Sequence, residues 1–225
     1  MSPMTKIRAY AALLRLPNVF TAVADPLAGW LLTGGAWSAQ LLPVLGTSAC
    51  LYSSGIVFND CFGYAADCRE RPERPLPSGA VARGVAWTLA VALMLAGLAL
   101  AWLAGTATLQ KAAILAALIL VYNGVRKLPG IMGACRAFNL LLGMTDFTVL
   151  WPPMALGVYV TVLSVVAQRD TANPAARRWV KRLLLGIIAL DAAFVVAVTG
   201  NWADAAAVLA LLLPAWLLAR FLEMT

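Results

Sequence analysis

Long stretches almost free of charged residues constrain this chain more than any other feature. Eight of them run over about 18–35, 41–58, 84–105, 108–125, 137–151, 153–168, 183–200 and 203–220. A helix needs about 20 apolar residues, within a range of roughly 17 to 25, to cross a bilayer. Only 12% of the 225 residues are charged, against roughly 25% in soluble domains. The sequence therefore predicts a single domain over 1–225, an all-α polytopic membrane bundle of about eight transmembrane helices.

The basic residues predict how this bundle is oriented. The region 137–168 could form one long helix or two short ones around Trp151, Pro152 and Pro153. Two helices would put 16 of the 17 Lys and Arg residues on one side and only Lys111 on the other. Since cytoplasmic loops are rich in Lys and Arg, we expect both termini to be cytoplasmic, in the inner membrane of a bacterial cell. The net charge of +7 is then a topology signal and does not indicate nucleic-acid binding.

Most of the polar chemistry lies in "FNDCFGYAADCRERPERPLPSG", residues 58–79. If the second helix continues past the membrane edge, Asn59, Gly63 and Asp67 share one face, with Asp60 about 100° away. Mg²⁺ prefers oxygen ligands and is often bound by one or two carboxylates plus phosphate oxygens. The arginines that follow could bind phosphate through two nitrogens. The alternative is a solvated loop whose arginines only set the topology.

The order of these residues resembles the first aspartate motif of the UbiA superfamily of intramembrane prenyltransferases. That motif has the form N-D-x-x-D-x-x-x-D, followed by R-x-x-R-P-L-x-x-G. The second element is matched by Arg71, Arg74, Pro75, Leu76 and Gly79. The resemblance covers residues 15–168 and includes "RLPNVFTAVADPLAGWLL" at 15–32, "YNGVRK" at 122–127 and "NLLLGM" at 139–144. Within the superfamily, the chain resembles the bacterial EboC-like proteins.

This resemblance implies a helical bundle in which two acidic motifs hold Mg²⁺ around a prenyl diphosphate whose tail lies in an apolar tunnel. Loss of diphosphate would give an allylic cation, which a lipophilic, electron-rich acceptor, often an aromatic ring, would attack. The implied metal ligands are Asn59, Asp60, Asp67 and Asp170. The implied substrate-binding residues are Asn18, Arg71, Arg74, Arg126 and Lys127, and the implied catalytic residues are Asp60, Asp67, Tyr122 and Lys127.

The sequence departs from the family pattern in three places. Gly63 stands where the first motif has its central aspartate. The second motif, expected in "AQRDTANPAARR", offers only Asp170, with Asn173 as a further oxygen donor. The usual ninth helix has no counterpart. Two hypotheses therefore remain: an Mg²⁺-dependent prenyltransferase, or a non-catalytic lipid-binding or lipid-transporting protein with a degenerate metal site.

Other polar residues have less specific interpretations. Asp25, Asp146 and Asp191 fall inside the predicted spans, where ionisable groups usually face the bundle interior. They could be functional, or they could hold helices together. The cysteines at 50, 61, 68 and 135 lack CxxC spacing and His partners, so we expect structural thiols and no zinc site.

Overall fold

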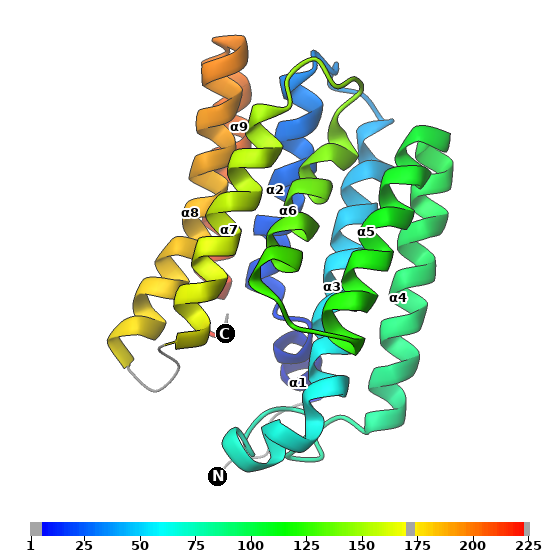
Figure 1. The fold of residues 1–225 in the computed structure, drawn as a ribbon, viewed down its shortest axis with the longest axis vertical. Coiled ribbons are helices and arrows are strands. Elements are labelled where there is room, and N and C mark those ends of the chain that lie inside the picture. Colours follow the sequence, from blue (N-terminus) through cyan, green and yellow to red (C-terminus); the bar gives the residue numbers. More distant parts are fainter. Residues whose placement is uncertain (1–5, 170–173, 223–225) are drawn as a thin grey trace.

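The computed structural model describes residues 6–169 and 174–222 and shows a helical bundle (Figure 1). Its helices are α1 (Lys6–Leu13), α2 (Leu16–Leu32), α3 (Leu41–Glu70), α4 (Arg83–Ala104), α5 (Thr106–Gly124), α6 (Pro129–Gly143), α7 (Trp151–Arg169), α8 (Pro174–Thr199), α9 (Trp202–Ala210) and α10 (Leu212–Leu218). From α2 onward, successive helices run up and down, and α9 continues into α10 (Figure 1). The predicted all-α membrane bundle is confirmed.

Length and composition identify the membrane-crossing helices. Among the described residues, five helices are long and apolar enough to span a bilayer: α3, α4, α5, and residues 151–168 and 178–199 of α7 and α8. The helices α2 and α6, with 17 and 15 residues, are shorter. They stand in the middle of the bundle, between α7 and α8 on one side and α3 and α5 on the other (Figure 1). The chain is an integral membrane protein with multiple spans.

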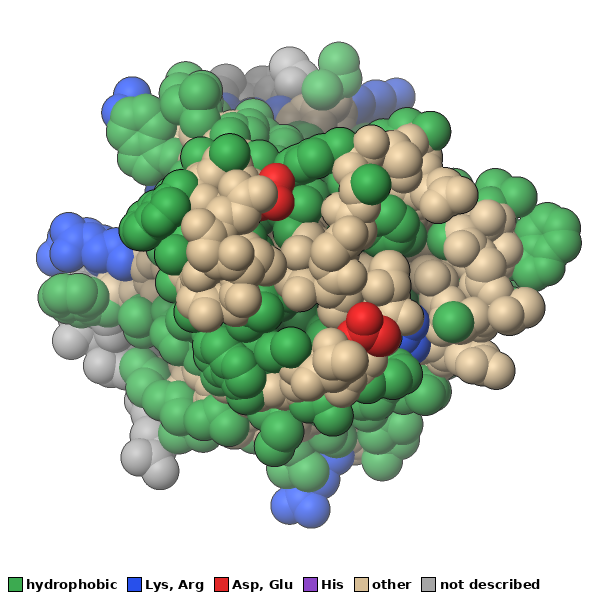
Figure 2. Space-filling view, turned by 90° about the horizontal axis from the view of Figure 1, so that it is seen from above, with side chains coloured by type: hydrophobic (Ala, Val, Ile, Leu, Met, Phe, Trp, Pro, Cys, Tyr) green, Lys and Arg blue, Asp and Glu red, His purple; other side chains and the backbone are tan. Residues whose placement is uncertain are grey.

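The two ends of the bundle differ in polarity. The connections at 33–40, 144–150 and 200–201 lie together at the upper end of Figure 1. Seen from above, this end presents mainly uncharged side chains and backbone (Figure 2). The connections at 71–82 and 125–128 lie at the opposite end (Figure 1), and they carry Arg71, Arg74, Arg126 and Lys127.

The middle of the chain corrects four predictions. The region 137–168 does contain two helices, but the first is α6, which begins at Pro129 and ends at Gly143. The connection is 144–150, whereas Trp151 to Pro153 form the first turn of α7, where proline is tolerated. Asp146 therefore lies in an exposed loop and not in a span, and hydrogen bonds from Thr148 lower its pKa. Arg136, assigned to a loop, lies inside α6 and is buried.

A proline explains the polar residues at the centre of the bundle. Pro26 lies inside α2, and because it has no N–H group, it cannot donate to the carbonyl of Ala22, four residues earlier. Two neighbouring helices satisfy that carbonyl. Ser48 Oγ of α3 donates to it at 2.9 Å, and Asn139 Nδ2 of α6 donates at 2.7 Å. An interrupted helix thus becomes the junction of three helices.

An ion pair reinforces this junction. Arg136 Nη1 of α6 lies 3.2 Å from Asp25 Oδ2 of α2, and both side chains are buried. Arg136 Nη2 also donates to the backbone oxygen of Thr21, at 3.2 Å. Asp191 of α8 is fully buried, and neither of its carboxylate oxygens has a hydrogen-bond partner among the described residues. The geometry favours the helix-holding interpretation of Asp25.

Glycines allow α6 to lie unusually close to its neighbours. A Cβ at Gly143 would collide with the Pro26 carbonyl of α2, and one at Gly29 would collide with the Leu140 carbonyl of α6. Without a hydrophobic driving force in lipid, helices associate through such close packing of small residues.

We expect Gly143→Ala to lower stability by about 1–3 kcal/mol, because the new methyl group has no space beside the Pro26 carbonyl. Gly84→Ala is the matched control, since a Cβ there meets no atom within 4 Å. Thermal unfolding in detergent measures both. Equal Tm values for the two variants would contradict the packing described here.

The orientation is tested by labelling in a cysteine-free background. Because positive-inside bias places the connection at 71–82 in the cytoplasm, cysteines at Ser38 and Trp202 should react with an impermeant maleimide from outside. A cysteine at Glu73 should react only after the membrane is opened. Labelling of position 73 from outside intact cells would show that the protein has the opposite orientation.

Candidate functional site

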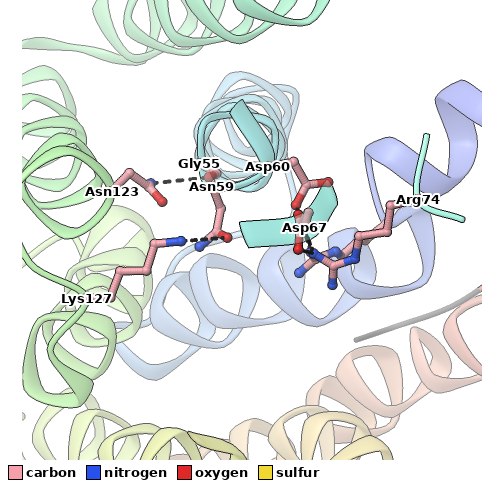
Figure 3. Close-up of polar contacts among 8 residues, drawn as sticks. Gly55, Asn59, Asp60, Asp67, Arg74, Asn123 and Lys127 are labelled. Atoms are coloured by element: carbon pink, nitrogen blue, oxygen red, sulfur yellow. Dashed lines mark hydrogen bonds and ion pairs between the residues drawn. The ribbon is translucent and has the colours of Figure 1, made fainter. Parts of the chain in front are cut away.

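The lower part of α3 carries a polar face. The helix continues to Glu70, as predicted, so Asn59, Gly63 and Asp67 lie one turn apart on the same face. Lys127, from the connection between α5 and α6, points at this face (Figure 3), and its Nζ donates to Asn59 Oδ1 at 3.2 Å. A Cβ at Gly63 would lie 3.6 Å from Lys127 Nζ and 3.9 Å from Asp67 Oδ2. The structure therefore brings Asn59, Asp67 and Lys127 together.

Arg74 reaches the same face from the proline-rich connection. Its Nη1 donates to both carboxylate oxygens of Asp67, at 3.1 and 2.9 Å (Figure 3). The connection keeps this position because Leu76 and Val81 are buried in the apolar cluster formed around α3, α4 and α5. The Val81 N–H closes the turn on the Pro75 carbonyl. The segment is thus a folded element that presents Arg74, and not only a solvated loop.

Asp60 holds two arginines at the edge of the site. Its Oδ1 accepts from Arg15 Nη2 at 3.0 Å and lies 3.6 Å from Arg74 Nη1. Arg15 has φ 44° and ψ 53°, and it is the one non-glycine residue with positive φ in the described chain. Such a conformation costs of order 1–3 kcal/mol and persists where surrounding contacts impose it. Here it separates α1 from α2 and directs Arg15 toward Asp60.

Desolvation affects the lysine of the site. Protein atoms around the Lys127 ammonium lower its pKa, and the negative charges of Asp67 and Asp60 oppose that shift. Lys127 remains accessible to a ligand, because its side chain is exposed. The polar face can therefore exchange its contacts with the protein for contacts with a ligand.

An apolar groove begins beside this cluster. It has a cavity volume of about 70 Å³ and is lined by residues of three helices, including Gly55, Asn59, Ile119, Tyr122, Met132 and Arg136. From Asn59 back to Tyr52 it follows α3 for about 10 Å, at 1.5 Å per residue. Gly55 lets α3 and α5 pack closely at the groove, since a Cβ there would lie 3.2 Å from Ile119 Cγ2. A charged cluster and an apolar groove thus meet at Asn59.

The remaining predicted residues have different positions. Tyr122 lines the groove. Arg126 is exposed in the same connection as Lys127, and Arg71 is half-buried at the end of α3. Asn18 is buried beside Tyr52, within the bundle. Asp170 and the rest of the second motif up to Asn173 lie outside the described residues.

Sequence reasoning missed two functional neighbours of the site. The ion pair between Arg15 and Asp60 joins residues 45 positions apart, and only the unusual placement of an arginine between two apolar segments hinted at it. Arg136 was assigned to a loop, although Asn139 one turn later and the apolar residues between them are typical of a helix face.

The oxygen donors suit Mg²⁺ only together with a ligand. Among residues 6–169 and 174–222, no three His, Cys, Asp or Glu side chains lie close enough to hold a metal ion. Asn59 and Asp67 offer hard oxygen ligands on one face, but each already contacts a protein cation. Diphosphate oxygens would complete such a set. The residues present therefore fit Mg²⁺ that binds with a diphosphate.

Comparison with known proteins identifies the family. The model of the UbiA prenyltransferase family matches residues 19–179. The chain belongs to the UbiA prenyltransferase family. It is similar to the digeranylgeranylglyceryl phosphate synthase of Ignicoccus hospitalis, with 34% identity over 59% of this chain and 44% of that protein. It is also similar to the digeranylgeranylglyceryl phosphate synthase of Methanothrix thermoacetophila, with 30% identity over 69% of this chain and 59% of that protein. The chain thus aligns with about half the length of these relatives.

Solved structures share the fold of this UbiA family member. A digeranylgeranylglyceryl phosphate synthase superposes with a TM-score of 0.63 at 19% identity, covering 97% of both chains. A UbiA homologue from Archaeoglobus fulgidus bound to DMAPP and Mg²⁺ gives a TM-score of 0.63 at 14% identity, covering 94% of this chain and 87% of that one. The narrower resemblance to EboC-like proteins stays a prediction.

Proposed function

We propose that this UbiA family member transfers an isoprenyl group from a prenyl diphosphate to a lipophilic, electron-rich acceptor at the cytoplasmic side of the membrane. The observation that carries the proposal is the contact between a cluster of cations and carboxylates and the mouth of an apolar groove. A prenyl diphosphate has the same division into a charged end and an apolar tail.

The side chains at the groove mouth suit the charged end of this substrate. Arg74 and Lys127 point at the polar face of α3, Arg71 follows the last residue of α3, and Arg126 is exposed next to Lys127 in the chain. Guanidinium groups bind phosphate through two parallel hydrogen bonds, whereas an ammonium acts as a point charge. Asp60 contributes as a positioning residue, because it holds Arg15 and Arg74 from the buried side.

The groove suits the tail and the chemistry. In the transfer, the bond between C1 and the diphosphate oxygen breaks and its electrons leave with the diphosphate. The acceptor then supplies an electron pair to C1 and loses a proton. Arg74 and Lys127 would stabilise the charge on the leaving group. The Tyr122 ring, beside Asn59 in the groove lining, would face the allylic cation, and the apolar walls would keep water from it.

Mg²⁺ is the cofactor we propose, bound together with the substrate. Asn59 and Asp67 would hold it, with Asp60 and Asp170 as the further ligands proposed from the sequence. When bound, the ion would neutralise developing charge on the diphosphate. The Archaeoglobus fulgidus homologue bound to DMAPP and Mg²⁺ supports this pairing.

The acceptor is proposed by chemical class only. The curated relatives are named for synthesis of digeranylgeranylglyceryl phosphate. The proposed class of acceptors therefore includes two kinds of nucleophile, an aromatic ring and the alcohol oxygen of a lipid-like phosphate. The second candidate function is binding or transport of a prenyl lipid without catalysis. The absence of a side chain at Gly63, between the two oxygen donors, favours it.

Arg74→Ala should lower both prenyl diphosphate affinity and turnover by about 10-fold or more, because a charge-assisted hydrogen bond to an ionised group contributes about 1.5–3 kcal/mol. Arg69→Ala is the matched control, since Arg69 is exposed at the end of α3. Mass spectrometry detects product after incubation with Mg²⁺, geranylgeranyl diphosphate and a membrane extract.

The affinity for geranylgeranyl diphosphate, measured beside product formation, separates the two functions. Product formation that falls in Arg74→Ala and not in Arg69→Ala supports the transferase. The lipid-binding function is supported if the protein binds the diphosphate but forms no product, while another UbiA family enzyme forms product with the same membrane extract. Absence of binding would reject both.

A further inference from the structure

The carboxyl group of Asp191 lies inside the membrane-crossing part of α8, and the function proposed above does not use it. It is fully buried, and no donor among the described residues reaches either of its oxygens. Asp25 Oδ1 of α2 is buried and has no donor from the described part of the chain either. The two side chains lie close enough for their charges to interact. Two carboxyl groups from different helices thus face each other inside the bundle.

One cation serves both carboxyl groups. Arg136 Nη1 of α6 lies 3.2 Å from Asp25 Oδ2, and the charge of Arg136 also acts on Asp191. Asn139 Nδ2 donates to the same Asp25 oxygen at 2.7 Å, but an amide carries no charge. If both carboxyl groups were ionised, the cluster would hold one uncompensated negative charge. Burying such a charge is far more costly than burying a neutral hydrogen-bonded group.

The helices packed against α8 offer no further cation to Asp191 within residues 6–169 and 174–222. Tyr159 of α7 donates its hydroxyl hydrogen to a backbone oxygen of α8, and Arg169 is the last residue of α7. Asp204 of α9 is acidic and lies in the first turn of that helix, and α10 has no titratable side chain. On α8 itself the basic residues end at Arg182, more than two turns before Asp191.

A proton would supply both the missing donor and the missing positive charge. An ionised carboxylate can only accept hydrogen bonds, whereas a protonated one also donates. We infer that Asp25 and Asp191 form a buried proton-binding site, which holds one proton between α2 and α8 at neutral pH. One ionised carboxylate then remains for one guanidinium. The inference is independent of the proposed transfer reaction.

The proton site is joined to the groove through two side chains. Arg136 and Asn139 both line the groove and both contact Asp25. While the proton is bound, Asp25 and Arg136 form a neutral pair behind the groove wall. Release of the proton would offer the guanidinium a second anion, on α8. Proton binding therefore sets the charge behind the inner wall of the groove.

Thermal unfolding of the full chain in detergent at several pH values tests the inference. A folded state that keeps a proton which the unfolded chain releases loses stability as the pH rises. For one proton in a chain of this size, the Tm of the wild type should fall more steeply than that of Asp191→Asn, by about 3–5 °C per pH unit near neutral pH. The amide resembles the protonated carboxyl group and binds no proton. Asp146→Asn, in an exposed loop, should keep the wild-type slope.

Infrared spectroscopy gives a readout that does not depend on unfolding. The C=O stretch of a protonated carboxyl group is separate from the carboxylate bands, so the difference spectrum between wild type and Asp191→Asn should contain it at neutral pH. The difference spectrum for Asp146→Asn should not.

Asp25→Asn keeps the inference falsifiable if Asp191→Asn loses stability. It leaves one carboxylate for Arg136, so the steeper fall of Tm with pH should disappear in this variant too. Wild-type slopes in both variants, or no protonated carboxyl band in the wild type, would overturn the inference. Stabilisation by Na⁺ over K⁺ that Asp191→Asn removes would overturn it as well, because a metal cation would then occupy the place of the proton.

Discussion

Every backbone polar group inside a bilayer must find a partner within the protein, and in this bundle Pro26 makes that constraint decisive. The carbonyl of Ala22 cannot be satisfied inside α2, so Ser48 of α3 and Asn139 of α6 donate to it. Glycines let α6 approach α2 closely enough for this contact. The junction fixes α3 and α6, which form two of the three walls of the groove.

Two polar networks thus have different tasks. The inner one, with Arg136 paired to Asp25 and bonded to the Thr21 carbonyl, holds α6 against α2. The outer one lies at the cytoplasmic end on our topology, where Lys127 and Arg74 contact exchangeable oxygens of Asn59 and Asp67. A ligand can replace those contacts. This difference explains why the chain keeps charged residues both inside the membrane and at its edge.

The sequence predicted the helical bundle and the shared helix face of the candidate site, because both depend on local patterns. Apolar stretches identify helices, and the spacing of Asn59, Gly63 and Asp67 identifies a helix face. The limits of α6 were wrong because hydropathy treats Arg136 as a loop residue, although its pairing with Asp25 allows it inside the bundle. The approach of Lys127 to Gly63 joins residues distant in the chain, and no local pattern encodes such contacts.

A structure determined with a non-hydrolysable geranylgeranyl thiodiphosphate tests the central claim most directly. We expect the diphosphate analogue between Lys127 and Arg74, and the tail along the groove lined by Ile119 and Met132. A tail in the groove with C1 beside Tyr122 would support the transferase. A diphosphate bound away from Asn59 and Asp67, or a tail lying outside the groove, would contradict it.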